Sequence, residues 1–261
     1  MPRANRHRVP GQVWHITERC HRKQFLLKFA RDRRAWVGWL YEARRRFGLC
    51  VLDYQVTSNH VHLLVRDRGQ DESAASIPLI AGRTGQSCTQ RKGRRGAFWE
   101  DRYHATAVDT EGDLARCVVY IDLNMVRAGA VRHPRDWGEA GYHEIQHARG
   151  KYRIIDRAAL SSALGVPEDR LAGGHAEWIE TALASSQRSR EPQWSEAIAV
   201  GRRAFVEDLQ RHLGARARYR QILAADGLSV LRDAEEGYRP VSRSKWAAEE
   251  QTELRLGTEP E

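Results

Sequence analysis

The fold is decided by two runs of sequence, LCVLDYQV from Leu49 to Val56 and HVHLLV from His60 to Val65. Both runs are rich in β-branched and aromatic residues, and only the polar tripeptide Thr57-Ser58-Asn59 separates them. A short polar connection between two such runs is typical of a β-hairpin. We therefore expect two neighbouring antiparallel strands in this part of the chain.

Another strand and two helices can be placed around this hairpin. The segment from Gln12 to Arg19 alternates and contains β-branched and aromatic residues, which predicts a strand. Between Phe29 and Phe47, apolar residues recur at spacings of three, four and seven, which predicts an amphipathic helix that Gly48 would end. After the hairpin, residues Ile77 to Arg91 predict a second helix, weakened by Pro78 and two glycines.

The order of these elements predicts the fold class. Residues Ala97 to Val108 are interpreted as a fourth strand, and a helix is expected to begin at Thr110, whose hydroxyl would cap it, and to end near Gly129. Strand, helix, strand, strand, helix, strand is the order of a ferredoxin-like split βαβ fold. We therefore expect an α+β protein with an antiparallel sheet and one further helix behind it.

The second half of the chain has a helical pattern. Apolar spacing predicts helices over Ile155 to Leu164, His175 to Ser185 and Trp194 to Leu213. The polar, Glu-rich end is expected to be disordered. DNA binding by a helix-turn-helix, dimerisation or plain packing all stay open for this region. The predicted division is a first domain at residues 1–147, an all-helical accessory region at 148–238 and a disordered tail at 239–261.

Composition narrows the class of partner. The chain has 261 residues, and its 43 Lys and Arg against 34 Asp and Glu give a formal net charge of +9. Such an excess favours nucleic acid over an acidic small molecule. The sequence shows no lipidation motif, no apolar run long enough to span a bilayer and no signal core at its start, so we expect no membrane partner and no export. The four cysteines show no C-x-x-C pairing and are interpreted as reduced thiols of a cytoplasmic protein.

Two histidines of the hairpin are candidate metal ligands. Side chains two apart on a strand point to one face, so His60 and His62 would converge while Val61 faces the core. Spacing alone does not decide the matter, because two nearby histidines are more often ordinary core or surface residues.

The helix after the fourth strand carries a second candidate set. At 3.6 residues per turn, Arg116, Tyr120, Asn124 and Arg127 fall on one side of it, and apolar residues fall on the other. Taken alone, Tyr120 is more readily interpreted as a core aromatic residue, and Asn124 as a residue with a local hydrogen bond.

Three motifs in this order resemble a known family. They are SNHVHLLV from Ser58, GAFWEDRYH from Gly96 and YIDLNMVRAG from Tyr120. Together they resemble the single-tyrosine HUH transposases of bacterial insertion sequences, and most of all the REP-associated tyrosine transposases. The resemblance runs from about Arg6 to Ile145. In this family, HUH denotes a histidine, a bulky hydrophobic residue and a second histidine.

The resemblance implies a site and a reaction. His60, His62 and Asn124 would bind a divalent metal, and Tyr120 would be the nucleophile that forms a 5′-phosphotyrosine link with single-stranded DNA. The implied enzyme cuts and rejoins a strand beside an imperfect hairpin. Two positions depart from the family: it often has Met-Pro where this chain has Thr57-Ser58, and Asn-Pro where it has Asn124-Met125. Without that proline, the helix is expected to continue smoothly.

Elementary chemistry agrees with these roles. A tyrosine hydroxyl has a pKa of about 10 and is a weak nucleophile at neutral pH, so a phosphodiester must be polarised by a cation. Two imidazoles and one amide oxygen leave coordination positions open for phosphate oxygens, which suits Mg²⁺ or Mn²⁺.

DNA contacts are expected from basic residues. The aromatic residues near the basic segment, Phe98, Trp99 and Tyr103, are interpreted as core residues more readily than as surfaces for base stacking. His15 and His104 are interpreted as structural residues or as neighbours of the metal ligands. The expected DNA contacts are Arg3, Arg6, Arg91, Lys92, Arg94, Arg95, Arg102, Arg116 and Arg127.

Two other functions remain as alternatives. The chain could be a DNA-binding protein that descends from such enzymes and no longer cuts, although a complete set of His60, His62, Tyr120 and Asn124 argues against this. It could also be a relaxase or replication initiator, but those proteins usually order the tyrosine and histidines differently. A monomer and a homodimer are both compatible with the sequence, and a bacterial cytoplasmic location is expected.

Overall fold

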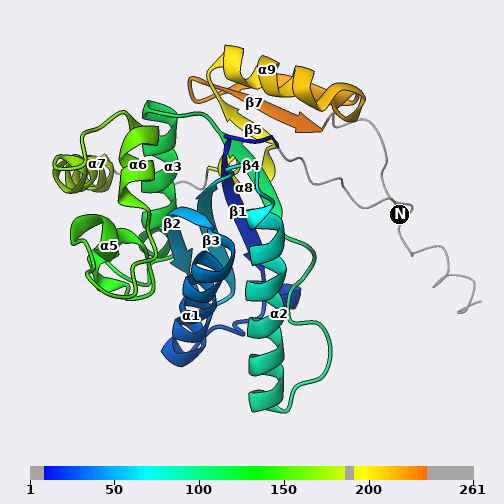
Figure 1. The fold of residues 1–261 in the computed structure, drawn as a ribbon, viewed down its shortest axis with the longest axis vertical. Coiled ribbons are helices and arrows are strands. Elements are labelled where there is room, and N and C mark those ends of the chain that lie inside the picture. Colours follow the sequence, from blue (N-terminus) through cyan, green and yellow to red (C-terminus); the bar gives the residue numbers. More distant parts are fainter. Residues whose placement is uncertain (1–8, 186–190, 234–261) are drawn as a thin grey trace, which may run out of the picture.

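The computed structural model describes residues 9–185 and 191–233, which build a mixed sheet with helices on both faces. The strands of this sheet follow the order β2-β3-β1-β4-β5-β7-β6 (Figure 1). The first four strands in the chain are β1 (Val13–Arg19), β2 (Cys50–Val56), β3 (His60–Arg66) and β4 (His104–Val108).

These four strands confirm the predicted α+β class and the ferredoxin-like core. β2 and β3 form the expected antiparallel hairpin, in which Val56 lies opposite Val61 and Gln55 opposite His62. β3 also pairs antiparallel with β1, and β1 with β4. β2 carries a bulge between Val51 and Asp53 that shifts its register by one residue. The fourth strand is shorter than predicted and begins only at His104.

Two long helices cover one face of this sheet. They are α1 (Ala30–Phe47) and α2 (Glu72–Lys92), which lie side by side in front of the sheet in Figure 1. Gly48 ends α1 in the left-handed conformation, as predicted. α2 includes Pro78 and is longer than predicted. Its Gly85 lets the chain before β4 approach closely, because a Cβ there would lie 3.3 Å from the Cβ of Phe98.

The helix that carries the candidate tyrosine lies on the opposite face. It is α3 (Gly112–Asp122), followed by the short α4 (Asn124–Arg127). Thr110 is not its cap: α3 begins one residue later than predicted, with Glu111 as N-cap, whose backbone N–H donates to the carbonyl of Ala163. α3 therefore begins without a side-chain cap, and a contact with a distant segment holds its first turn in place. The helix is also interrupted at Leu123, so loss of the proline after Asn124 does not give a continuous helix.

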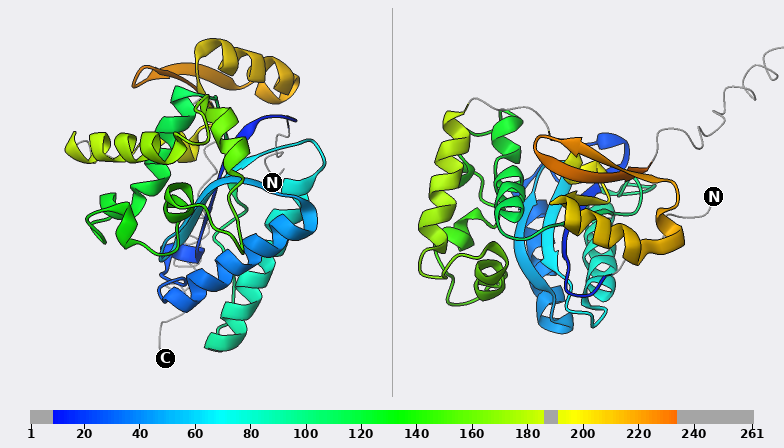
Figure 2. Two further views of the ribbon diagram at one scale, coloured as in Figure 1. Left: turned by 60° about the vertical axis from the view of Figure 1, so that its left-hand side comes forward. Right: turned by 90° about the horizontal axis from the view of Figure 1, so that it is seen from above.

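Further helices pack beside α3. Of these, α6 and α7 confirm two predicted helices, whereas no helix was predicted where α5 lies. Figure 2 shows this group on one side of the sheet and the C-terminal strands at its end. The bounds are α5 (Tyr142–Gln146), α6 (Arg157–Leu164) and α7 (Leu171–Ala184), with the 3-10 turns η1 (His21–Lys23), η2 (Pro134–Asp136) and η3 (Gly214–Ala217).

The C-terminal region is not all-helical, which corrects the prediction. The single helix expected over Trp194 to Leu213 is instead α8 (Gln193–Glu196), β5 (Ala199–Gly201) and α9 (Arg203–Leu213). A hairpin follows, made of β6 (Arg220–Ala225) and β7 (Leu228–Asp233).

The reason for this error is tertiary pairing. β5 pairs parallel with β4 and antiparallel with β7, so sheet hydrogen bonds replace helical ones in the apolar run around Val200. At Gly201, a Cβ would overlap the side chain of Asp109. The sheet therefore runs across the boundary expected after residue 147. The tail at 239–261 lies outside the described residues, and none of the described helices combines the length and apolar content needed to cross a membrane.

The two faces of the four-stranded core differ in chemistry. On the face toward α1 and α2, the strands present apolar side chains, which include Ile16, Val61 and Leu63. On the face toward α3 and α8, the strands present mostly polar side chains, although they are equally buried. These polar residues are His15, Asp53, Gln55, His62 and Thr106, each no more than 2% exposed.

Candidate functional site

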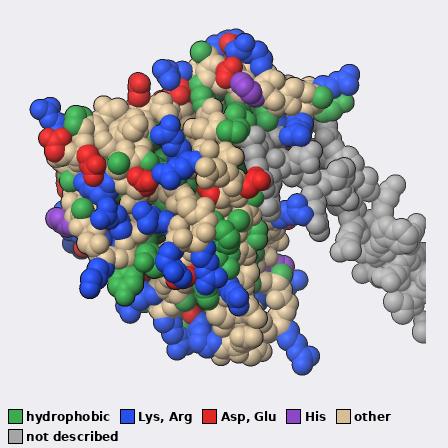
Figure 3. Space-filling view, in the orientation of Figure 1, with side chains coloured by type: hydrophobic (Ala, Val, Ile, Leu, Met, Phe, Trp, Pro, Cys, Tyr) green, Lys and Arg blue, Asp and Glu red, His purple; other side chains and the backbone are tan. Residues whose placement is uncertain are grey.

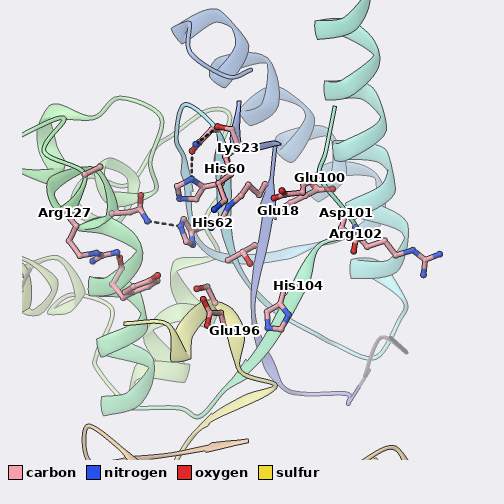
Figure 4. A pocket seen from close by; sticks show the side chains of 17 residues that line it. Glu18, Lys23, His60, His62, Glu100, Asp101, Arg102, His104, Arg127 and Glu196 are labelled. Carbon is pink, nitrogen blue, oxygen red and sulfur yellow. Dashed lines mark hydrogen bonds between the residues drawn. The ribbon is translucent and has the colours of Figure 1, made fainter. Parts of the chain in front are cut away.

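A cavity of about 620 Å³ opens at the end of the polar face. It lies between β1, β3, β4, the α3–α4 segment and α8 (Figure 4). Residues far apart in the sequence meet here. Its lining includes His60, His62, His104, Tyr120 and Asn124, the basic residues Arg19, Lys23, Arg102 and Arg127, and Glu18, Glu100, Asp101, Ser195 and Glu196.

The two hairpin histidines converge in this cavity. Because they alternate with the buried Val61 on β3, both rings stand on the same face, and their centroids are 4.9 Å apart. Their Nε2 atoms are the candidates for metal binding, since each Nδ1 atom is engaged by a neighbouring side chain.

Asn124 and Tyr120 approach His62 from the helix side. The side-chain nitrogen of Asn124 lies 3.0 Å from Nε2 of His62. The ring of Tyr120 has its centroid 5.9 Å from that of His62 and is nearly perpendicular to it. Positions 120 and 124 are one helical turn apart, so both side chains face the sheet despite the interruption at Leu123. The structure thus brings together within one chain the four residues that the sequence singled out.

His60 is oriented by the turn that precedes it. Its Nδ1 lies 2.8 Å from Oδ1 of Asn59, which can only accept, so Nδ1 carries the hydrogen. The hydroxyl of Thr57 lies 2.9 Å from the same nitrogen and donates to the carbonyl of His60. In the neutral ring, Nε2 is then the unprotonated nitrogen. Thr57, where the family often has another residue, is therefore a direct partner of a candidate ligand.

His62 is oriented by a second buried histidine. Its Nδ1 lies 2.9 Å from Nε2 of His15, and the two rings stack with centroids 5.1 Å apart. Nδ1 of His15 lies 2.7 Å from the carbonyl oxygen of Trp194. Burial lowers the pKa of His15 to about 4 and holds the pKa of His62 well below its ordinary value, so both rings are neutral at neutral pH.

These side chains fit a divalent cation. Neutral imidazoles and an amide oxygen suit ions such as Mn²⁺ and Mg²⁺ that also take phosphate oxygens. Within residues 9–185 and 191–233, no group of three or more His, Cys, Asp or Glu is arranged to hold a metal. A third protein ligand beside His60 and His62 would therefore be the Asn124 amide, whose oxygen and nitrogen can exchange places by rotation.

Basic side chains surround the candidate nucleophile. The guanidinium of Arg127 lies 4.2 Å from the centroid of the Tyr120 ring and donates to the backbone carbonyl of Tyr120 over 2.7 Å. Arg102 lines the cavity as well, so two of the predicted DNA contacts lie at the site.

Two further basic residues of the cavity were not predicted. Arg19 could have been found, because it follows His15 and Thr17 in the same alternation along β1. Lys23 gave no signal, because its position depends on a turn in which Arg22 and Lys23 have positive φ angles of 53° and 56°. Asn59 holds this turn by donating to the carbonyl of Lys23.

The other predicted DNA contacts lie away from the cavity lining. Arg91 and Lys92 form ion pairs with the buried Asp32, which gives both a structural role. Arg94 donates to the carbonyl of Ala97, and Arg116 to that of Asp226. Arg95 is exposed, whereas Arg3 and Arg6 lie outside the described residues. Figure 3 shows that Lys and Arg side chains also gather over α1, on the face away from α3.

Comparison with known proteins identifies the part of the chain that holds this site. Residues 11–124 match the family model of IS200-like transposases. This range contains His60, His62 and Tyr120 and ends at Asn124. This part of the chain is therefore similar to the IS200-like transposases, in agreement with the resemblance of its motifs. The C-terminal half, including α8, lies outside the match.

Two solved structures are similar to the chain. One is a REP-associated tyrosine transposase bound to a REP hairpin, with 23% identity and a TM-score of 0.48, covering 59% of this chain and 90% of that one. The other is a protein of Deinococcus radiodurans R1 described as a candidate transposase, with 15% identity and a TM-score of 0.31, covering 40% of this chain and 83% of that one. None of the curated proteins compared with the chain matches it.

Proposed function

We propose that this protein is a DNA transposase that cleaves and rejoins single-stranded DNA next to a hairpin. Tyr120 is the nucleophile, and His60, His62 and Asn124 bind Mg²⁺ or Mn²⁺. The observation that supports this proposal is the meeting of all four side chains in one cavity of one chain. A tyrosine packed only for stability would have no reason to share a cavity with two imidazoles whose Nε2 atoms are unprotonated.

The proposed cleavage is a transfer of one phosphodiester bond. The hydroxyl oxygen of Tyr120 attacks the phosphorus and loses its proton, and the 3′-oxygen of the preceding nucleotide leaves and gains one. A 5′-phosphotyrosine and a free 3′-hydroxyl result, so the energy of the broken bond is kept. Attack by a 3′-hydroxyl on the adduct reverses the step and joins strands. The bound cation would polarise the phosphate and stabilise its developing charge.

Basic residues of the cavity would hold the strand in place. Arg19, Lys23 and Arg102 line the cavity together with Arg127, and four such cations can neutralise several phosphates of a bound strand. Arg127 would also fix the Tyr120 ring against rotation, because it stacks on the ring and bonds to the same residue's carbonyl. The preference for hairpin DNA rests on the resemblance of the three motifs.

The arrangement favours catalysis within one chain. Because Tyr120 already lies beside His62 of the same chain, a monomer contains the full proposed set. Mixing Tyr120→Phe protein with His62→Ala protein tests this point: the mixture should form no more covalent adduct than either variant alone. Recovery of adduct in the mixture would show that the tyrosine acts in the site of a second copy.

The central experiment detects the covalent intermediate. The purified full chain is incubated with end-labelled single-stranded hairpins taken from the DNA that flanks its own gene, with Mg²⁺, with Mn²⁺ and with a chelator. We expect an adduct that survives denaturation, requires the cation and is absent in Tyr120→Phe. Tyr142→Phe is the matched control and should form the adduct as the natural protein does, because Tyr142 packs against His133 and His175, away from the cavity.

Other outcomes would separate the alternatives. Tight hairpin binding without an adduct under any cation would favour a DNA-binding protein that no longer cuts. An adduct that persists in Tyr120→Phe would contradict the assignment of the nucleophile. Cleavage of unstructured strands as readily as of hairpins would contradict the proposed substrate while leaving the reaction in place.

A further inference from the structure

A short segment from the C-terminal half reaches the candidate metal site. α8 places the carbonyl oxygen of Trp194 2.7 Å from Nδ1 of His15, and the Trp194 ring lies 6.4 Å from that of Tyr120 between centroids. Ser195 and Glu196 line the same cavity, and Figure 4 labels Glu196 there. None of these three residues belongs to the segment that matches the transposase family.

The hydrogen bonds that start at the carbonyl of Trp194 determine which ring nitrogen of His15, and then of His62, carries the hydrogen. A carbonyl oxygen can only accept, so Nδ1 of His15 carries the hydrogen and its Nε2 is the acceptor in the neutral ring. The hydrogen between the two histidines must then belong to Nδ1 of His62. Nε2 of His62, the atom that faces Asn124, is left with its lone pair. That is the form of the ring that binds a metal.

We propose that His15 is a positioning residue for the metal ligand His62, and that the segment Gln193–Glu196 completes the metal site through the carbonyl of Trp194. The inference rests on the proposed function, because it concerns the ligands assigned there. In metal-binding histidines, the N–H of the other ring nitrogen commonly donates a hydrogen bond to an oxygen acceptor. Here the acceptor is a second imidazole, which is itself fixed by a backbone carbonyl 179 residues away in the sequence.

Burial makes this arrangement sensitive to the loss of one partner. His15 is fully buried and His62 is 2% exposed, so water cannot replace a missing acceptor without entering the core. If His15 were apolar, Nδ1–H of His62 would lie unpaired in the interior, which is unfavourable. The ring would then shift toward the other tautomer, in which the hydrogen is on Nε2 and blocks the metal.

The test measures Mn²⁺ binding to the full chain without DNA, by electron paramagnetic resonance of the free ion. In His15→Phe, which keeps a ring but has no acceptor, we expect affinity to fall by about 10- to 100-fold, the range known for partners of metal ligands. His15→Gln, whose amide can both accept and donate, should recover most of the loss. His133→Phe, which removes a partly buried histidine outside the cavity, should leave the affinity unchanged.

A second measurement needs no variant. Long-range ¹⁵N correlation spectra of histidine-labelled, metal-free protein should show His62 protonated at Nδ1 and unprotonated at Nε2. The opposite tautomer would overturn the proposal, and so would unchanged Mn²⁺ affinity in folded His15→Phe. Both measurements are made without DNA, so they are distinct from the adduct assay. Binding of Mn²⁺ with the expected dependence on His15 but without any adduct would refute the proposed reaction and leave this inference standing.

Discussion

The two faces of the central sheet are equally buried but are built from opposite chemistry. Toward α1 and α2, the strands present apolar residues such as Ile16 and Leu63, which bury area and need no partners. Toward α3 and α8, the same strands present His15, Gln55 and Thr106, each of which is hydrogen bonded across elements. Alternation along a strand thus lets one element supply a core on one side and a site on the other.

This difference between the two faces shows which of them can account for the stability of the fold. Buried polar groups contribute little net free energy even when they are paired, and they are costly when unpaired. A protein under selection for stability alone would have little use for this polar face. Its retention in the interior is explained if the polar face positions the metal ligands, and the following predictions test that division of roles.

The largest effect is expected from the proposed metal ligand on the polar face. His62→Ala removes a ligand itself, so Mn²⁺ affinity should fall by more than the roughly 100-fold associated with the loss of an outer partner. The covalent DNA adduct should disappear as well. By contrast, the melting temperature should change only slightly. Mn²⁺ titration and the adduct assay check the result, and near-normal Mn²⁺ binding in this variant would exclude His62 as a ligand.

The neighbouring residue on the apolar face should behave in the opposite way. Leu63→Ala leaves a cavity under α1 and α2, because Leu63 is 1% exposed, and should lower the free energy of unfolding by about 2 to 5 kcal/mol. Mn²⁺ affinity of the remaining folded protein should not change. Urea unfolding and Mn²⁺ titration measure the two quantities. A large loss of affinity would show that the two faces are not independent.

A smaller effect on stability is expected from a polar pair outside the metal ligands. The hydroxyl of Thr106 donates to the carbonyl of Ala197 over 2.7 Å, and that carbonyl also lies 2.8 Å from Nε2 of His104. Thr106→Val keeps the shape and leaves the carbonyl one partner, so the free energy of unfolding should fall by about 1 kcal/mol. Urea unfolding measures this change. A fall in the free energy of unfolding as large as that of Leu63→Ala would contradict the small contribution to stability that we assign to the polar face.

The smallest effect is expected from the ion pair between Asp109, which follows β4, and Arg202, which lies between β5 and α9. Burial alone would raise the pKa of Asp109, but hydrogen bonds from Arg202 and from the backbone N–H of Thr110 outweigh it, and the pKa lies below its ordinary value of 3.8. Because the folded pKa is lowered, this stabilisation is present above the unfolded pKa and is lost as the pH falls through the folded one.

Arg202→Met should therefore lower the melting temperature by a few degrees at pH 7. The difference from the natural protein should shrink toward pH 2, where the Asp109 carboxylate is protonated in both. Thermal unfolding followed by circular dichroism across this range gives the comparison. A difference that stays constant with pH would mean that Arg202 acts by packing.

The sequence predicted those parts of the fold and site that depend on local periodicity. A period of two places His60 and His62 on one face, and a period near four places Tyr120 and Asn124 together, but these four are named as one site only through the resemblance of three motifs to a known family. The hairpin and the first helix followed from the same patterns. In each pair or element predicted in this way, the residues are close in the sequence, whereas the meeting of the histidine pair with the tyrosine helix joins segments about 60 residues apart.

The remaining features depend on contacts between distant segments. No local pattern links His15 to Trp194, because their contact needs β5 to pair with β4 and bring α8 over the sheet. The run around Val200 resembled a helix, because a strand of three residues leaves almost no periodic signal. The predicted roles of Arg91 and Lys92 in DNA binding could not be weighed without the position of Asp32, which pairs with both.

The parallel pairing of β4 with β5 also has a consequence for the order in which the protein matures during synthesis. A ribosome adds about 5 to 20 residues per second, so Trp194 is made about 10 to 40 seconds after His15. Throughout that interval, the nascent chain lacks the carbonyl that holds His15, and once β4 has been made its edge stays open until β5 follows. Translation itself thus delays completion of the proposed metal site until the C-terminal segments have been made.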